Sequence, residues 1–115
     1  MSLDDLLQKM KEEYLEVLPI RIELLKKLTK EKNWEQLEVE FHKLKGTGKT
    51  YGFPSVSILC AVFEIVASKQ NPANEGDITQ AILGLEKILA SELAGKTFEI
   101  ESDLELQKLM KAHHP

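Results

Sequence analysis

The chain has 115 residues, of which 43% are hydrophobic and 30% charged, with a formal net charge of −4. This length suits one domain with a single core, and the composition excludes a disordered or fibrous protein. The acidic balance offers no general surface for nucleic acid, and no apolar run reaches the roughly 18 residues of a membrane span, so we expect a cytoplasmic protein.

The first predicted element is helical and covers residues 3–28. Its apolar residues recur at steps of three and four, the period of an amphipathic helix; they are Leu3, Leu6, Leu7, Met10, Tyr14, Leu18, Ile22, Leu25 and Leu28. Pro19 lies inside this stretch, and proline removes a backbone donor and clashes with the preceding turn. We therefore expect either one long bent helix or two shorter ones.

The second predicted helix starts at Asn33, whose side chain can cap it, with Gln36 placed as in a capping box. Its expected core residues are Trp34, Leu37, Phe41, Leu44, Gly48 and Tyr51. Gly52 can end this helix in a left-handed conformation, and Pro54 can open a third helix that runs to about Lys69. The expected core residues of that helix are Val56, Leu59, Val62, Phe63 and Val66.

Residues 70–77 hold the densest cluster of helix breakers and predict a loop, after which Asp77 and Gln80 repeat the capping pattern. The fourth predicted helix ends near Gly95, and its expected core residues are Ile78, Ile82, Leu85, Ile88 or Leu89, and Leu93. Residues 96–101 alternate between polar and apolar types and favour an extended segment. Ser102 is placed to cap a last short helix over residues 102–110.

Short connections between amphipathic helices make neighbouring helices antiparallel. We therefore predict an all-α, up-down antiparallel four-helix bundle in residues 1–95, with an N-terminal helical extension, and a C-terminal tail in residues 96–115. Cys60 lies among apolar residues and is expected to be a buried structural thiol. We expect a monomer.

His42 lies on the outer face of the second predicted helix. With about 100° of rotation per residue, Lys45 and Lys49 fall within about 60° of His42, whereas the core residues centre roughly 130° away. Gly46 falls on the same outer face. A solitary histidine on a charged helix face is ordinarily only solvated, so the neighbouring residues decide how His42 is interpreted.

Three glycines follow His42, and a glycine inside a helix costs about 0.5–1 kcal/mol relative to alanine. Close packing explains Gly48, and helix termination explains Gly52. Gly46 has neither reason, and its expected use is to make room for another molecule beside His42. Neutral imidazole is a nucleophile near pH 7 that can accept a phosphoryl group, and Lys45 and Lys49 are placed to neutralise the added charge.

The motif around His42 resembles the histidine-containing phosphotransfer (HPt) domains of two-component phosphorelays. It reads His42-Lys43-Leu44-Lys45-Gly46-Thr47-Gly48, followed by Gly52. The resemblance extends to residues 14–19, Asn33-Trp34, Leu59-Cys60, Glu64 and Ala67. It covers roughly residues 3–93 and leaves out the segment from Lys96 onward.

The resemblance implies a bundle whose histidine Nε2 takes a phosphoryl group from a receiver-domain phospho-aspartate or from a kinase, and passes it to another receiver aspartate. It implies His42 as phosphoacceptor, Lys45 as the cation facing the phosphate, and Gly46 as the residue that permits docking. The resemblance further implies a carrier without a cofactor or metal of its own, with magnesium supplied by the receiver, and no Gly-rich nucleotide loop indicates a kinase activity. Glu64 stands where the family often has a side chain that bonds the other histidine nitrogen, although it is equally well interpreted as a solvated residue.

Receivers and a hybrid histidine kinase are thus the implied partners, and apolar groups near His42 should be partly exposed. The candidates are Val39, Phe53, Pro54 and Val56, of which Phe53 suits the core equally well. Two rival functions remain open. One is a scaffold or inhibitor of the same fold that carries no phosphate; the other is a metal or enzyme site that joins His42 to His113 and His114.

Overall fold

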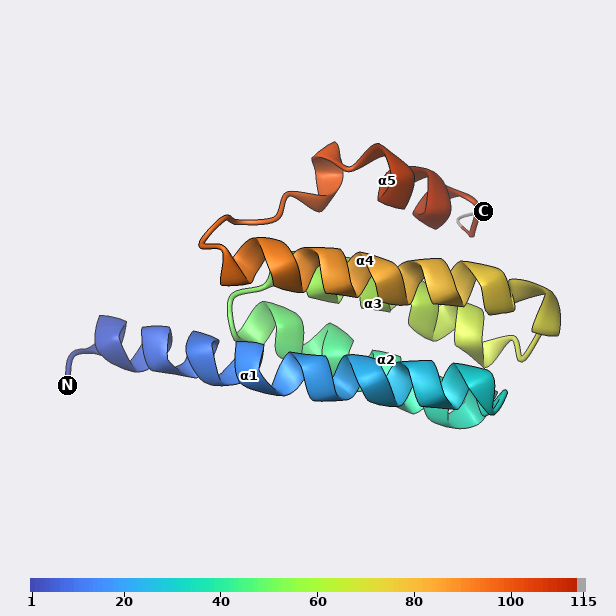
Figure 1. The fold of residues 1–115 in the computed structure, drawn as a ribbon, viewed down its shortest axis with the longest axis horizontal. Helices are drawn as coiled ribbons and strands as arrows, with labels where there is room; N and C mark the ends of the chain where they lie inside the picture. The colour runs from blue at the N-terminus through green and yellow to red at the C-terminus, as the bar shows by residue number, and fades with distance from the viewer. Residues whose placement is uncertain (114–115) are drawn as a thin grey trace.

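The computed structural model describes residues 1–113, and within them the chain forms five α-helices and two short 3₁₀ turns. The elements are α1 (Leu3–Lys30), α2 (Trp34–Thr50), α3 (Pro54–Ser68), η1 (Pro72–Asn74), α4 (Glu75–Leu93), η2 (Ile100–Ser102) and α5 (Leu104–Lys111). The four long helices lie side by side with alternating direction, and α5 lies along the outside of α4 (Figure 1). The predicted all-α bundle is confirmed.

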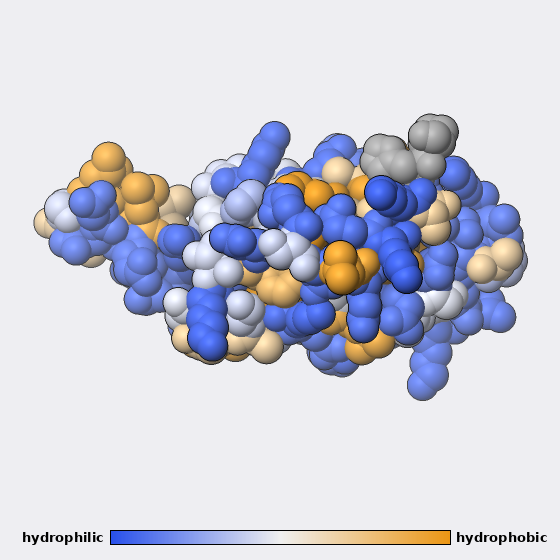
Figure 2. All heavy atoms as spheres, turned by 90° about the horizontal axis from the view of Figure 1, so that it is seen from above, coloured by the Kyte–Doolittle hydropathy of each residue, from blue (hydrophilic) through white to orange (hydrophobic). Residues whose placement is uncertain are grey.

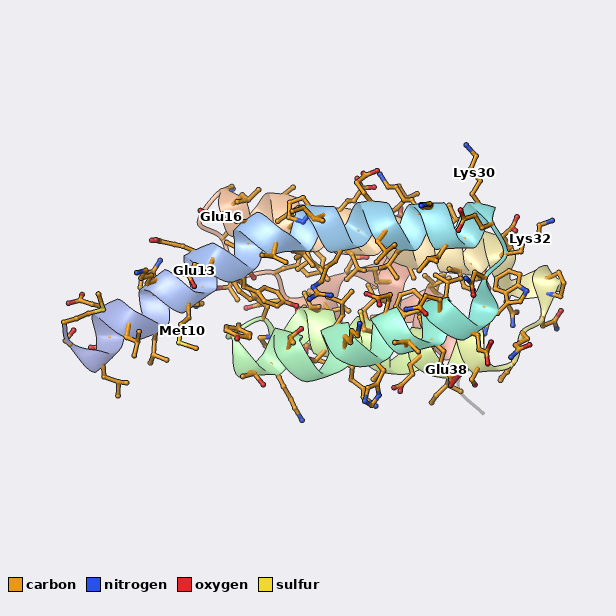
Figure 3. All side chains as sticks on the ribbon, turned by 90° about the horizontal axis from the view of Figure 1, so that it is seen from below. Met10, Glu13, Glu16, Lys30, Lys32 and Glu38 are labelled. Carbon is orange, nitrogen blue, oxygen red and sulfur yellow. The ribbon has the colours of Figure 1, made fainter. Side chains whose placement is uncertain are left out.

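Helix α1 is a single helix that passes through Pro19 without a break. It changes direction along its length (Figure 3), so the first of the two predicted alternatives is correct. Its start is fixed by a capping box, in which the Ser2 hydroxyl accepts from the Asp5 amide at 3.1 Å. Tyr14 is the first buried residue of the helix. Residues 1–13 therefore form the predicted extension, which projects beyond the bundle (Figure 1).

Helices α2 and α3 approach each other closely at Gly48. A Cβ atom built on Gly48 would lie 2.8 Å from the Ser57 hydroxyl oxygen and 3.0 Å from Val56 Cβ, so a side chain has no room there. Gly52 ends α2 with a φ of +91°, a conformation that glycine adopts without strain. The packing and termination roles predicted for these two glycines are confirmed.

Two predicted helix caps are wrong. Helix α4 begins at Glu75 rather than after Asp77, because Asn71 caps the turn η1 and this turn continues directly into the helix. Helix α5 is capped by Asp103 rather than Ser102, since the Asp103 carboxylate accepts from the Leu106 amide at 2.9 Å. At Asn33 the cap is correct but only half of the box forms, because the Gln36 side chain bonds Glu40 instead.

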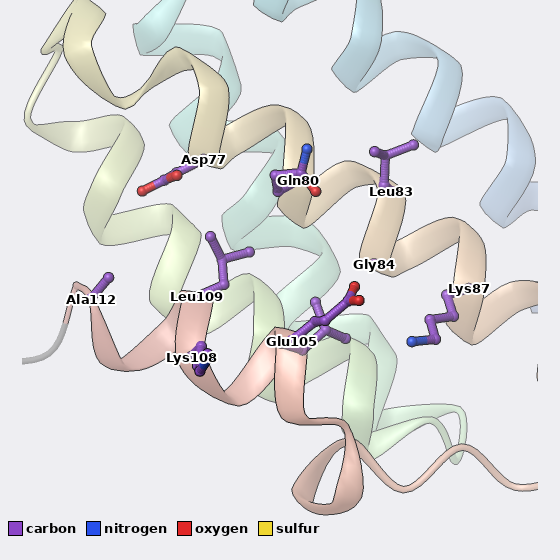
Figure 4. Close-up of a pocket in the computed structure, with 10 residues that line it drawn as sticks. Asp77, Gln80, Leu83, Gly84, Lys87, Glu105, Lys108, Leu109 and Ala112 are labelled. Atoms are coloured by element: carbon purple, nitrogen blue, oxygen red, sulfur yellow. The ribbon is translucent and has the colours of Figure 1, made fainter.

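The C-terminal segment packs on the bundle instead of trailing from it. Ile100, Leu106 and Met110 are buried in the same core as the long helices. Gly84 permits the contact, since a Cβ there would lie 2.7 Å from a Leu106 methyl group. Beside this contact, α4 and α5 border an open groove of about 530 Å³ (Figure 4).

The core lies between the long helices and includes most of the predicted residues. Phe41, Phe63 and Leu85 have no exposed side-chain surface, and Cys60 is buried as expected. Burial raises the pKa of the Cys60 thiol, with a further contribution from the Glu64 charge. Leu93 is an exception: it is the last residue of α4 and is exposed. Among the described residues, no helix is both long and apolar enough to cross a membrane.

Candidate functional site

His42 lies in the middle of α2 and its side chain is 66% exposed. The preceding residue, Phe41, is fully buried against Phe63 of α3. Successive helical residues point about 100° apart, so the burial of Phe41 fixes the direction in which His42 points outward. The predicted outer position of His42 is confirmed.

The imidazole of His42 is held by a residue of the neighbouring helix. Its Nδ1 atom lies 2.5 Å from Oε1 of Glu64, on α3. The other oxygen of the same carboxylate, Oε2, lies 2.6 Å from the Lys45 ammonium. Of the two interpretations of Glu64, the solvated one is wrong, because the side chain is only 18% exposed and contacts both neighbours.

The charge state of Glu64 determines which nitrogen of His42 is available. Burial acts to raise the pKa of Glu64, but the hydrogen bonds from Lys45 and His42 outweigh it and hold the pKa below its ordinary value. The carboxylate is therefore ionised at neutral pH and can only accept hydrogen bonds. A neutral His42 then carries its hydrogen on Nδ1, which leaves a lone pair on the exposed Nε2.

Ser57 fixes the backbone of the motif against α3. Its hydroxyl donates to the Lys45 carbonyl oxygen at 2.6 Å and accepts from the Lys49 amide, also at 2.6 Å. Sequence reasoning missed Ser57. Gly48 could have pointed to Ser57. A glycine at the contact of two helices lets them approach closely, and a small polar residue of the second helix can then bond the backbone of the first.

A second set of contacts ties the motif to α1. The Tyr14 hydroxyl lies 3.2 Å from the Thr47 hydroxyl, and the Tyr14 ring stacks on Phe53 and Tyr51, each at 5.3 Å between ring centres. Burial raises the pKa of Tyr14, although its bond to Thr47 acts in the opposite direction. Tyr14 thus remains a neutral, structural residue at pH 7.

The surface beside His42 is open at Gly46. Apart from its chain neighbours and the backbone of its own helix, no heavy atom of the described residues lies within 4 Å of the position that a Gly46 Cβ would take. Lys49, one turn further on, is also exposed. Another molecule can therefore approach the imidazole over Gly46 without displacing a side chain.

Of the four docking candidates, Phe53 takes the core position that was its stated alternative, and Val56 is not exposed for docking. Phe53 is 2% exposed because it stacks on Tyr14, and Val56 is fully buried because it faces Gly48. Val39 and Pro54 are exposed as expected. Ile58 and Ile65 of α3, which sequence reasoning did not single out, are 41% and 58% exposed. The sequence of α3 is apolar on all sides of the helix. One buried face cannot hold so many apolar residues, so some of them must be exposed.

His42 and His113, the two histidines that the structure describes, do not share a site. His113 bonds Asp77 at 2.7 Å and meets the Phe63 ring edge-on, whereas His42 bonds Glu64. His114 lies outside the described residues. Within residues 1–113, no three histidine, cysteine or acidic side chains are grouped closely enough to hold a metal ion.

Fold and site together define a class of protein: a helical bundle that presents one oriented, solvent-accessible imidazole on a helix face. A comparison with protein families matches residues 9–112 to the Hpt domain. The chain belongs to the Hpt domain family, whose members are histidine phosphotransfer modules of two-component signalling and interact there with receiver domains and kinases. No curated protein and no solved structure gave a significant match.

Proposed function

We propose that His42 is the phosphoacceptor of this domain. It receives a phosphoryl group from a receiver-domain phospho-aspartate or from a kinase, and passes it to the aspartate of another receiver. The observation that carries the proposal is the contact between His42 Nδ1 and Glu64, which leaves Nε2 as the exposed nucleophilic atom.

The transfer step needs no base from this chain. The Nε2 lone pair attacks phosphorus, the N–P bond forms, and the bond from phosphorus to the aspartyl oxygen breaks, so the aspartate leaves as a carboxylate. Nδ1 keeps its hydrogen throughout, and the ring gains positive charge. The Glu64 carboxylate, 2.5 Å from Nδ1, stabilises that charge as it develops.

Receiver docking is assigned to the exposed surface around His42. Val39 lies one turn before His42, Gly46 leaves the surface open one turn after it, and Ile65 follows Glu64 on α3. Val39 and the open surface at Gly46 lie on either side of His42 along α2, and such a limited surface suits a small interface that dissociates readily, as a carrier needs. Magnesium and the acidic pocket are assigned to the receiver.

The test is transfer from phosphorylated receivers to the purified full chain. We expect labelling that is lost in acid and stable in base, as a phosphoramidate requires, and we expect His42→Gln to abolish it. His113→Gln is the matched control, because it removes a histidine that contacts neither Glu64 nor Lys45. Labelling of the His42→Gln variant would refute the proposal.

The same experiment separates the rival function of a scaffold or inhibitor. A scaffold binds receivers without becoming labelled, and its binding is the same with or without the imidazole. Binding without labelling by a full panel of the host's receivers and kinases would therefore favour the scaffold.

A further inference from the structure

The hydroxyl of Ser57, on α3, bonds two backbone groups of α2 that belong together. It donates to the carbonyl oxygen of Lys45 and accepts from the amide of Lys49, each at 2.6 Å. In a regular α-helix an amide bonds the carbonyl four residues earlier, and Lys45 and Lys49 form such a pair. Within residues 1–113, no other helix contributes a side chain that bonds the α2 backbone.

Gly48 lets this hydroxyl reach the neighbouring helix. A Cβ atom on Gly48 would lie 2.8 Å from Ser57 Oγ, so any larger residue would push the serine away. A buried hydroxyl needs a partner, and inside a helix it commonly bonds the carbonyl four residues earlier in the same helix. Ser57 is 8% exposed and bonds α2 instead.

The contact between α2 and α3 at Ser57 continues to the imidazole. Glu64 lies two turns further along α3, within about 20° of Ser57 around the helix. Its carboxylate bonds His42 Nδ1 at 2.5 Å and the Lys45 ammonium at 2.6 Å. Lys45 is therefore bound by α3 at both ends, at its carbonyl and at its ammonium. Ser57 holds backbone atoms, whereas Glu64 holds side chains, whose position follows that of the backbone.

Small rotations of α2 move the imidazole by more than a hydrogen bond tolerates. Side chains reach about 5–6 Å from a helix axis, so a rotation of about 10° displaces the ring by about 1 Å. The contact of 2.5 Å between His42 Nδ1 and Glu64 would then lie at the limit of a hydrogen bond. The ring keeps its orientation only if the rotation of α2 against α3 is closely fixed.

We infer that Ser57 is a positioning residue for the proposed transfer: by holding the α2 backbone, it fixes the rotation at which His42 Nδ1 meets Glu64. Without the hydroxyl, Nδ1 loses its fixed partner, and the ring hydrogen moves to Nε2 for part of the time. Nε2 is then unavailable as a nucleophile for that part. The effect on the ring concerns the unphosphorylated chain, and only the effect on transfer rests on the role proposed for His42.

Nitrogen NMR of the His42 ring tests the orientation in the full, unphosphorylated chain. With the ring neutral, the chemical shifts of Nδ1 and Nε2 report which nitrogen carries the hydrogen. We expect the hydrogen on Nδ1 in the wild type, and Glu64→Ala gives the reference for a ring without its partner. Ser57→Ala should move both shifts toward that reference. Wild-type shifts in Ser57→Ala would overturn the inference.

Ser55 provides a matched control on the same helix. Its hydroxyl is also buried and donates to a backbone carbonyl, that of Phe98, at 2.8 Å. Ser55 and Ser57 lie about 160° apart around α3. Figure 2 views the molecule from the side of α5, to which the segment of Phe98 leads, and Figure 3 from the side of α1 and α2.

Ser55→Ala should therefore lose a comparable hydrogen bond and leave the ring of His42 unchanged. Urea unfolding of the Ser55 and Ser57 variants measures how much stability each loses. Equal changes of the ring shifts in the two variants would assign the effect to a general loss of stability and refute the positioning role.

Single-turnover transfer from a phosphorylated receiver tests the consequence for the reaction. We expect Ser57→Ala to lower the rate about tenfold, part of the roughly 100-fold that a displacement of 1 Å can cost. Combined with Glu64→Ala, it should cause no further loss, because Ser57 acts through that carboxylate. A double variant slower than Glu64→Ala alone would contradict this route.

A second variant and a second readout keep the inference separate from folding and from the proposed function. Ser57→Cys keeps a weaker donor and acceptor in the same place and should show the same changes of the ring to a smaller extent. If the ring shifts change as expected but the wild-type chain is not labelled at His42, the proposed function fails and the positioning of the ring stands. Labelling with unchanged ring shifts in both Ser57 variants means the reverse.

Discussion

Glu64 is the residue that turns an exposed imidazole into an oriented one. Its two carboxylate oxygens are divided between His42 and Lys45. The Lys45 ammonium therefore lies on the Nδ1 side of the ring, away from Nε2, the proposed phosphoacceptor atom. In the resting state Lys45 acts on His42 through Glu64, and facing the phosphate requires it to leave that carboxylate.

Removal of the Glu64 carboxylate should slow transfer without unfolding the domain. A hydrogen bond to a charged group is worth about 1.5–3 kcal/mol, and 1.36 kcal/mol is tenfold in rate. We expect Glu64→Ala to lower the transfer rate about 10- to 100-fold, and Glu64→Gln, whose amide oxygen can still accept from Nδ1, to lower it less. Single-turnover transfer from a phosphorylated receiver measures both, and unchanged rates would exclude the orienting role.

A double-mutant cycle with Lys45→Met separates the two roles of the lysine. If Lys45 acts only through Glu64, the double variant is no slower than Glu64→Ala alone. If Lys45 also contacts the phosphoryl group, the double variant is slower than either single variant, because the two reductions in transfer rate combine.

Gly46 and Gly48 differ in what a side chain would meet, and alanine at each should change stability in opposite directions. Gly46→Ala should stabilise the domain by about 0.5–1 kcal/mol, because the site is open and alanine favours the helix. Gly48→Ala should destabilise it by about 1–3 kcal/mol, since the new methyl group meets Ser57 and Val56. Urea unfolding of the two variants measures the difference.

The proposed docking over Gly46 leads to a second prediction for this position. Gly46→Gln should keep its helicity and lose transfer, because the side chain occupies the approach to His42. Transfer at the wild-type rate would remove the functional explanation of this glycine.

At the scale of elements, periodicity predicted the long helices but not all of their boundaries. A helix that buries one face has apolar residues at regular spacing, and this spacing is clear along α2 and α3. The first residue of a helix depends instead on which of several nearby polar side chains bonds the backbone of the first turn. Asn71 and Asp77 are equally acceptable in type, and the choice follows from the 3₁₀ turn at Pro72, which leads directly into α4.

Helix α5 shows why residues 96–113 were hardest to predict. The segment is short, and its contact depends on Gly84 of α4, far away in sequence. A glycine in a helix indicates close packing but does not name the side chain that approaches it. Only the fold identifies that side chain as Leu106. The family match, which continues to residue 112, agrees with a packed segment.

The packing of α5 gives an element-scale prediction. Leu106→Ala should lower the free energy of unfolding by about 2–4 kcal/mol, because Leu106 is 5% exposed and its loss leaves a cavity beside Gly84. Leu104→Ala is the control, since Leu104 is 79% exposed and should change stability by less than about 0.5 kcal/mol. Equal effects in urea unfolding would mean that α5 is not docked on α4 in solution.

At the scale of the whole molecule, the sequence was sufficient for the fold class and for the outward position of His42, since the spacing within one helical segment sets both. It was insufficient for the contacts of Ser57 and for which apolar side chains near the motif are exposed. Exposure depends on how helices rotate against each other, and Phe53 and Val56 face inward while Ile58 and Ile65 face outward. Helix rotation is a property of the assembled bundle.

The exposure of His42 also bears on how long a signal persists. A side chain that is 66% exposed is open to water as well as to a docking protein, and within residues 1–113 the ring is held on one side only, by Glu64. For the phosphohistidine proposed at this position, the lifetime would then be set by the intrinsic hydrolysis of a phosphoramidate and by the supply of receivers. The proposed carrier would therefore follow the present supply of phosphoryl groups and would store little of an earlier signal.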